Sequence, residues 1–307
     1  DTMGRPILQI EDNGQDLSNV EIYYNTELDV DIEGNLRSIT DARGNVEMQY
    51  KYDMLGNQVY QNSMDTGQRW LIKNTMGDAL RTWDERNQTF SFTYDALHRL
   101  TLKTIIGGDG ITPLNNVFEK IMYGEGLPGD TTNNWRTKPV YVYDTAGKVV
   151  TTAYDFKGNP LNTVRTFATD YKGVVNWGVP NPDLALDTTE SFSSTFEYDA
   201  LSRIIQQTTP DGSTHQLAYN EAALLNQVQL TQNGNTSFFV KKIDYNEKRK
   251  RSKIRYGNDV TTNYFYDIQT FRLIRLQTTR LNNDPLQDLY YTIDPVGNIN
   301  FIVDKNI

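Results

Sequence analysis

One short spacing recurs along this chain and constrains its fold more than any other feature. It is Asp or Asn followed three residues later by Gly, and it includes nine of the 21 glycines. The numbers of Asp, Asn and Gly residues alone would give about four such pairs. The pairs are Asp1/Gly4, Asp31/Gly34, Asp41/Gly44, Asp53/Gly56, Asn74/Gly77, Asp144/Gly147, Asp155/Gly158, Asp170/Gly173 and Asp294/Gly297. Five of these glycines are followed by Asn, which indicates a tandem array of one small structural unit.

Turn chemistry explains the spacing. An Asp or Asn at the first position of a type I turn bonds the backbone two residues later. A Gly at the fourth position adopts the left-handed conformation that closes a hairpin with a bulge. Four further turns carry another residue in place of Gly: Asn87 after Asp84, His98 after Asp95, Ser202 after Asp199, and Arg249 after Asn246. Asn and His tolerate positive φ, so distorted turns are expected only at the last two.

The segments between the turns have the pattern of half-buried strands. Val46, Met48, Tyr50 and Tyr52 alternate with polar residues, and successive turns lie about ten to twelve residues apart. The chain holds 19 Tyr and 12 Phe, so the apolar surface to be buried is largely aromatic. We predict an all-β fold of tandem antiparallel hairpins that form a long curved or spiralling sheet, because each hairpin buries its apolar face only against its neighbours.

The turn residues and the aromatics that precede them are the predicted structural motif. The predicted turn residues are Asp31, Gly34, Asp41, Gly44, Asp53, Gly56, Asp144, Gly147, Asp155, Gly158, Asp294 and Gly297. The predicted repeat aromatics are Tyr52, Tyr94, Tyr143, Tyr154, Tyr198 and Tyr266. Tyrosine suits this position because its ring packs while its hydroxyl reaches polar groups.

The unit Tyr-Asp-x-x-Gly-Asn/Arg resembles the YD repeat of Rhs proteins. It stands in this chain as YDMLGN (52–57), YDALHRL (94–100), YDTAGK (143–148), YDFKGN (154–159) and YDALSRI (198–204). Longer stretches, such as IRYGNDVTTNYFYD (254–267) and LQDLYYTIDPVGNI (286–299), resemble the Rhs region of insecticidal toxin-complex (Tc) B and C components and of SpvB-type toxin proteins. The resemblance spans nearly the whole chain and implies a fragment without the Rhs core or the toxin domain.

The resemblance implies a function as well as a fold. In that family the repeats form a hollow Rhs shell that encapsulates a C-terminal toxic polypeptide for delivery. The implied partners are that polypeptide and other toxin-complex subunits, with glycans or a host receptor as further candidates, and the implied location is secreted or extracellular. Two alternatives stay open: a carbohydrate- or receptor-binding module of a YD-repeat surface adhesin, and an enzyme that acts on carbohydrate through irregular loops.

Residues 1–307 are predicted to be a single repeat region. Two segments rich in Gly, Pro and Asn interrupt the repeats at about 103–139 and 173–194. Long loops of this kind are where binding tends to occur. The first is expected to hold a short helix or strand near residues 117–123.

Composition argues against several kinds of chemistry. The net charge of −9 repels phosphate backbones and anionic membranes, so neither nucleic acid nor membrane insertion is expected. The chain has no Cys and two distant His residues, so we predict no metal and no cofactor. The acids have turn roles and no catalytic motif is present, so the chain is predicted not to be an enzyme. A weak calcium site at 29–35 is the alternative reading of one turn.

Overall fold

The computed structural model describes residues 1–108 and 110–306, which form 23 strands and one short 3₁₀ helix. The alternation of apolar and polar residues produces these strands, and the turn residues end them. Two compact units are present. Unit 1 contains Asp1–Tyr123, Pro139–Val149 and Thr166–Thr189, and unit 2 contains Gly124–Lys138, Val150–Arg165 and the residues from Glu190 onward.

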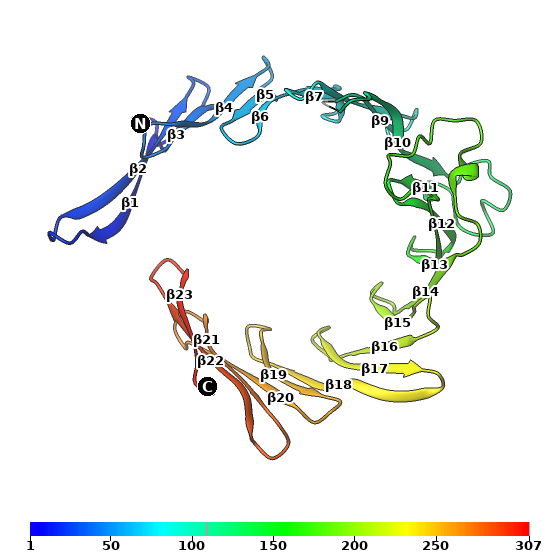
Figure 1. Cartoon of the computed structure of the whole chain (residues 1–307). Helices are drawn as coiled ribbons and strands as arrows, with labels where there is room; N and C mark the ends of the chain where they lie inside the picture. Colours follow the sequence, from blue (N-terminus) through cyan, green and yellow to red (C-terminus); the bar gives the residue numbers. More distant parts are fainter. Residues whose placement is uncertain (109, 307) are drawn as a thin grey trace. The chain divides into compact units, whose positions relative to one another are not determined.

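Unit 1 holds the strands of the first half of the chain (Figure 1). They are β1 (Leu8–Gln15), β2 (Glu21–Val30), β3 (Leu36–Thr40), β4 (Val46–Tyr52), β5 (Gln58–Ser63), β6 (Gly67–Lys73), β7 (Ala79–Asp84), β8 (Gln88–Tyr94), β9 (Leu100–Gly107), β10 (Leu114–Tyr123) and β11 (Pro139–Asp144). Each strand pairs antiparallel with the next from β1 to β11.

Unit 2 repeats the same arrangement. Its strands are β14 (Phe192–Tyr198), β15 (Ile204–Thr208), β16 (Thr214–Tyr219), β17 (Leu225–Gln232), β18 (Asn235–Tyr245), β19 (Arg251–Tyr256), β20 (Thr261–Tyr266), β21 (Leu273–Thr279), β22 (Pro285–Ile293) and β23 (Ile299–Asp304). β12 (Gly147–Tyr154) and β13 (Pro160–Phe167) have residues in both units. Antiparallel pairing of consecutive strands runs from β13 to β23. The predicted all-β fold of tandem antiparallel hairpins is confirmed.

The predicted irregular segments contain more regular structure than their composition suggests. The first, 103–139, includes the end of β9 and all of β10, so the element expected near 117–123 is a strand. The second, 173–194, includes the 3₁₀ helix η1 (Pro182–Ala185) and the start of β14. No helix in the described part of the chain is long and apolar enough to cross a membrane.

Few side chains are fully buried. The buried hydrophobic residues of the described chain are Ile105, Val140, Tyr143, Tyr154, Ala168, Trp177, Val240, Ile243 and Ile254. In unit 2, Val240, Ile243 and Ile254 form one cluster with half-buried tyrosines around it. In unit 1, Tyr143, Ala168 and Trp177 form the other. A fold in which each hairpin packs mainly on its neighbours leaves most strand residues half-buried.

The unit 1 cluster is completed by residues 168–189, which we call the clasp. Trp177 is fully buried, and its indole N–H donates to the carbonyl of Asp144 at 3.0 Å. Its backbone N–H donates to the carbonyl of Val117 at 2.8 Å. Its ring lies 5.2 Å from that of Tyr143, centroid to centroid. These contacts hold the clasp against β10 and β11.

A polar contact reinforces the clasp. The hydroxyl of Tyr143 donates to Oδ1 of Asp183 at 2.8 Å, and Nζ of Lys148 lies 2.8 Å from Oδ2 of the same carboxylate. Burial raises the pKa of the Tyr143 hydroxyl, and the bond to Asp183 raises it further, so this hydroxyl stays a donor at neutral pH. The predicted repeat aromatic Tyr143 therefore bonds the clasp.

Candidate functional site: closed turns and tyrosine bonds

The loops of an antiparallel array alternate between its two edges. In unit 1, one edge carries the turns at 1–5, 31–35, 53–57, 74–78 and 95–99. In unit 2, one edge carries the turns at 155–159, 199–203, 220–224, 246–250, 267–272 and 294–298. We call this the motif edge of each unit. Most of the Asp/Asn turns lie on it, and it is the candidate functional element of the chain.

The turn at 53–57 shows how the motif works. The amide of Gly56 donates to the carbonyl of Asp53 at 3.1 Å, and the amide of Asp53 donates to the carbonyl of Asn57 at 2.9 Å. Oδ1 of Asp53 accepts the amides of Leu55 and Asn57 at 2.9 and 2.8 Å. Oδ2 accepts the side-chain amide of Asn57 at 3.0 Å. Both oxygens of one carboxylate thus hold the turn closed. The bond to Oδ2 explains why Asn follows the glycine.

The same bonds recur at the other glycine turns. The amides of Gly34, Gly44, Gly158 and Gly297 each donate to the carbonyl of the aspartate three residues earlier, at 3.0–3.1 Å. Their φ angles are +95°, +82°, +88° and +115°, a region that favours glycine. The register shifts by one residue beside these turns, as between Lys51 and Tyr52, so each closes a bulged hairpin.

The turns expected to be distorted are regular, and that prediction is wrong. Ser202 and Arg249 adopt φ of +62° and +59°, close to the +58° of Asn87 and His98. The amide of Ser202 donates to the carbonyl of Asp199 at 3.0 Å, and that of Arg249 to the carbonyl of Asn246 at 2.9 Å. The bonds of the first turn residue therefore impose the left-handed conformation on side chains that do not favour it.

Two predicted pairs have a different geometry. Asp144 and Gly147 flank a two-residue link between β11 and β12, and Gly147 has a φ of +146°. A Cβ at Gly147 would lie 2.2 Å from the carbonyl oxygen of Thr166. Glycine is favoured there both by this close approach of the backbone and by its positive φ. Asp170 accepts the amide of Gly173 at 3.0 Å within the clasp, outside any hairpin.

Hydrogen bonding holds the turn carboxylates in their charged form. The side-chain amide of Asn35 lowers the pKa of Asp31, and the amides of Asn45 and Asn57 do the same for Asp41 and Asp53. At Asp155, desolvation opposes the shift, but the bonds from Asn159 lower the pKa overall. No group of three or more His, Asp or Glu side chains suited to a metal ion occurs in residues 1–108 and 110–306.

Tyrosine hydroxyls connect successive turns along the motif edge. Each donates to the carbonyl of the first residue of the strand that follows the preceding turn on that edge. The bonds are Tyr52 to Leu36 (2.9 Å), Tyr94 to Ala79 (2.8 Å), Tyr123 to Leu100 (3.1 Å), Tyr198 to Pro160 (3.0 Å), Tyr219 to Ile204 (2.9 Å), Tyr245 to Leu225 (2.6 Å) and Tyr266 to Arg251 (2.8 Å). Each of these seven tyrosines therefore fastens the turn that follows it to the preceding turn on that edge.

Some of these tyrosines were missing from the predicted set. Tyr219 precedes Asn220, but Ala223 stands where the spacing expects Gly, so the Asp/Asn–Gly pattern does not mark it. Tyr123 precedes Gly124, and no local signal marks it. Tyr154 was predicted and is buried, with 7% of its surface exposed. Burial raises the pKa of Tyr52, Tyr94 and Tyr198, which keeps these hydroxyls protonated as donors.

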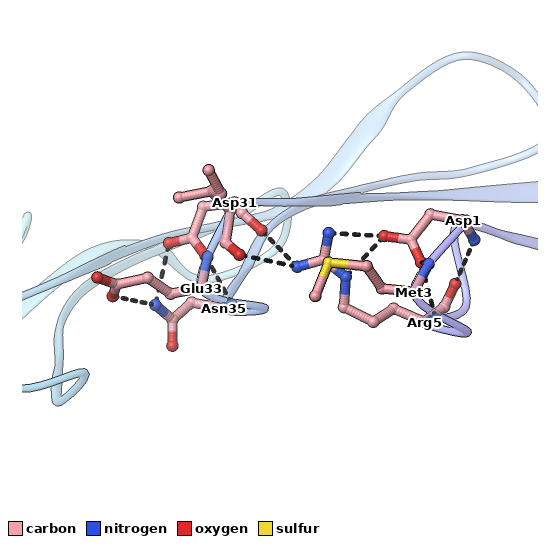
Figure 2. Close-up of polar contacts among 7 residues, drawn as sticks. Asp1, Met3, Arg5, Asp31, Glu33 and Asn35 are labelled. Atoms are coloured by element: carbon pink, nitrogen blue, oxygen red, sulfur yellow. Dashed lines mark hydrogen bonds and ion pairs between the residues drawn. The ribbon is translucent and has the colours of Figure 1, made fainter.

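Basic side chains add a second link between neighbouring turns. Figure 2 shows the guanidinium of Arg5 between the carboxylate of Asp1 and the next turn. Its Nε donates to Oδ2 of Asp1 at 2.6 Å, and its Nη1 donates to the carbonyl of Asp31 at 2.8 Å. In unit 2, Nη1 of Arg272 donates to the carbonyl of Asp294 at 2.7 Å. A planar guanidinium suits this role because it donates in several directions at once.

The comparisons with known proteins agree with this geometry. Toxin subunit YenC2 of Yersinia entomophaga is 25% identical over 300 residues, which cover 88% of the chain and 30% of YenC2. Toxin subunit YenC1 of the same organism is 28% identical over 191 residues, which cover 60% of the chain and 20% of YenC1. The chain is homologous to these toxin subunits. No protein-family model matches it.

Solved structures that share this fold include Tc toxin components. The crystal structure of TcdB2-TccC3 matches 99% of the chain with a TM-score of 0.87 and 25% identity, and the match covers 15% of that protein. The Tc holotoxin pore of Photorhabdus luminescens shares the fold, with a TM-score of 0.87 at 24% identity. The predicted resemblance to Tc components is confirmed. The chain spans less than a third of the length of each of these toxin subunits.

Proposed function

We propose that this chain is a structural segment of the β-shell of a secreted Tc-type toxin and helps to encapsulate a C-terminal toxic polypeptide. The observation that carries the proposal is the match to TcdB2-TccC3 over 99% of the chain with a TM-score of 0.87. Residues 1–307 would serve as one repeat region, with the two irregular segments as insertions. The partners would be the enclosed polypeptide and the other subunits of the toxin complex.

The motif edge supports a wall function. Sheet edges and hairpin ends are places where backbone groups are easily left without partners. Here Asp and Asn side chains accept the backbone amides of the motif turns, and seven tyrosine hydroxyls each fasten a turn to the previous one. Pulling one hairpin away from its neighbour must therefore break a side-chain bond as well as the strand pairing. A wall that encloses an unfolded polypeptide needs such continuity.

We also propose that the chain itself is not an enzyme. The turn carboxylates are engaged by amides of their own turns, which keeps their pKa low and makes them poor proton donors near neutral pH. An isolated chain that hydrolysed a glycan, with the activity abolished by a single acid-to-amide change, would overturn this.

The wall function is testable in a chimera. The chain would replace the matching region of YenC2, with a reporter polypeptide fused downstream, and protease would then be added. We expect the reporter to resist digestion until the assembly is unfolded by denaturant. A control chimera carries Tyr to Phe changes at Tyr52, Tyr94 and Tyr198, and its reporter is expected to be digested faster. Equal digestion in the folded and unfolded assemblies would exclude encapsulation.

A glycan or host-receptor partner is the second candidate. It is favoured by a row of half-buried aromatic side chains, Tyr60, Trp70 and Trp83, on strands β5–β7 of unit 1.

A further inference from the structure

Three aromatic rings form a row on one face of unit 1. Tyr60 lies directly opposite Trp70 on the neighbouring strand, and Trp70 lies directly opposite Trp83. Directly paired residues point to the same face of a sheet. The ring centroids are 5.5 Å apart for Tyr60 and Trp70, and 6.2 Å apart for Trp70 and Trp83, whose planes are 8° from parallel. All three side chains are half-buried.

Trp70 and Trp83 differ from the other two tryptophans of the chain in the hydrogen bonding of their indole N–H groups. Those of Trp135 and Trp177 donate to the carbonyls of Thr152 and Asp144, at 3.1 and 3.0 Å. Within the described part of the chain, the N–H groups of Trp70 and Trp83 have no hydrogen-bond partner. A buried Trp usually satisfies its N–H within the protein, whereas these two half-buried indoles leave theirs without a partner among the described residues. The row therefore combines apolar ring surface with free donors.

Amide side chains surround the row on the same face. Gln49 is paired with Asn62, and Asn62 with Gln68, by direct opposition across β4, β5 and β6. None of these three side-chain amides has a hydrogen-bond partner in the described residues. The face therefore presents aromatic surface flanked by polar groups that can donate and accept hydrogen bonds.

The charged side chains around the aromatic row are equally divided between positive and negative. Lys51 lies opposite Tyr60, with Nζ 4.9 Å from the ring centroid, and Arg81 lies opposite Ile72, one pair from Trp70. Glu47 occupies the same face by strand alternation, and Glu85 accepts the backbone amide of Gln68 at 2.9 Å. Two cations thus face two carboxylates in a chain of net charge −9, which favours an uncharged ligand.

The topology argues against a peptide or a nucleic acid. An extended peptide that joins a sheet needs a free strand edge for its backbone bonds. β5, β6 and β7 are paired on both sides. A single nucleic-acid strand needs a cationic groove for its phosphates, and the balanced charges do not provide one. A pyranose ring needs neither a free strand edge nor a cationic groove. Its C–H face stacks on an aromatic ring, and its hydroxyls form hydrogen bonds with amides.

We propose that the face of β4–β8 bearing Tyr60, Trp70 and Trp83 binds an uncharged oligosaccharide. The rings stack on successive sugars, and the indole N–H groups and the amides of Gln49, Asn62 and Gln68 bond the hydroxyls. This inference deepens the glycan candidate of the previous section and is independent of the wall function. Loss of reporter protection in the YenC2 chimera would not argue against oligosaccharide binding.

The test is a titration of the full chain with neutral hexasaccharides. Isothermal calorimetry with cellohexaose, mannohexaose and maltohexaose is expected to show saturable binding of at least one. Trp70→Ala and Trp83→Ala are each expected to weaken that binding about tenfold or more, as loss of a stacked ring does elsewhere. The matched control is Tyr171→Ala, which removes an aromatic of unit 1 that is 83% exposed and lies outside the row, and it is expected to bind unchanged.

Two further variants keep the result interpretable. Trp70→Phe retains ring stacking and removes the N–H, so an intermediate affinity is expected. Gln68→Ala leaves the rings in place and is expected to weaken binding a few-fold even if the Trp variants fold poorly. Absence of binding to all three sugars would overturn the proposal. So would binding of polydeoxythymidine or of an unfolded polypeptide at the row, as judged by the same Trp variants.

Discussion

A single carboxylate organises five residues at motif turns such as 53–57. Oδ1 faces two backbone amides, and Oδ2 faces the side chain at the fifth position. The turn at 74–78 reverses the pair: Asn74 stands first, and its Nδ2 donates to Oδ2 of Asp78 at 3.0 Å. The acid and the amide of such a pair can therefore exchange places. The fifth position is also where Arg99 and Arg203 pair with their turn aspartates.

The reversed pair leads to a swap experiment. Asp53→Ala is expected to lower the Tm by ~3 °C, because it removes the acceptors of three turn bonds. The double variant Asp53→Asn with Asn57→Asp is expected to return close to the parent Tm, since it recreates the Asn74/Asp78 arrangement. Differential scanning calorimetry measures both. Asp65→Ala, at an exposed position in another loop, is the control and should leave the Tm unchanged. A double variant no better than Asp53→Ala would contradict the pairing.

The tyrosine bonds predict a second residue effect. Tyr52→Phe keeps the ring and leaves the carbonyl of Leu36 without its 2.9 Å donor. We expect a loss of about 1 kcal/mol in the free energy of unfolding. Chemical denaturation measures it, with Tyr171→Phe as a control because that side chain is 83% exposed. Equal stability of the two variants would show that the hydroxyl bond contributes nothing.

At the level of elements, the clasp differs from the hairpins. A hairpin is held by strand pairing to its neighbours, whereas the clasp is held by side chains that dock onto strands already formed. Trp177 fills the site between β10, β11 and the clasp, and Asp183 bonds Tyr143 and Lys148 at the far end. Such a segment can separate from the sheet without breaking any strand pair except its own bridge from Ala168 to Leu186.

Trp177→Ala should therefore act locally. We expect a loss of roughly 3–5 kcal/mol from the docked state, the usual cost of removing a buried Trp. Hydrogen exchange should accelerate across 168–189, with little change in β2–β6. Val179→Ala, at a clasp position that is 40% exposed, is the control. Equal acceleration throughout unit 1 would mean that the clasp and the sheet unfold together.

At the level of the whole chain, the titrating groups set a range of stable pH. Turn aspartates such as Asp31, Asp41 and Asp53 have lowered pKa values, and bonds from Thr209 and Ser213 lower that of Asp211 to about 2. A group whose pKa is lower in the folded state contributes stability above its unfolded value, near 3.9, and loses it as the pH falls. The buried tyrosines have raised pKa values and lose their contribution as the pH rises through about 10.

The Tm is therefore expected to stay nearly constant between about pH 5 and pH 9. It should fall steeply from about pH 4 toward pH 2, as the turn carboxylates are protonated. Calorimetry in buffers of constant ionic strength measures this. A steep fall between pH 7 and pH 5 would contradict the assignment, because the turn aspartates do not titrate there.

The turn motif could be predicted from the sequence because its bonds join residues within four positions of one another. Asp53, Gly56 and Asn57 interact in the same way wherever the hairpin lies, so the spacing alone specified the local geometry. The alternation in 46–52 likewise specified strands, and with them the all-β class. The exceptions show the limit: Arg249 adopts the left-handed turn because the bonds around it outweigh its own preference.

What depends on residues far apart in sequence was decided by the tertiary structure. Tyr52 reaches Leu36 only because β3 and β4 pair in a particular register, and Trp177 contacts Tyr143 only when the clasp folds back onto the sheet. Trp70 and Trp83 form a row because the 74–78 turn sets that pairing. Register depends on turn length and bulges summed along the chain, and docking depends on shape, so neither can be read from a local pattern.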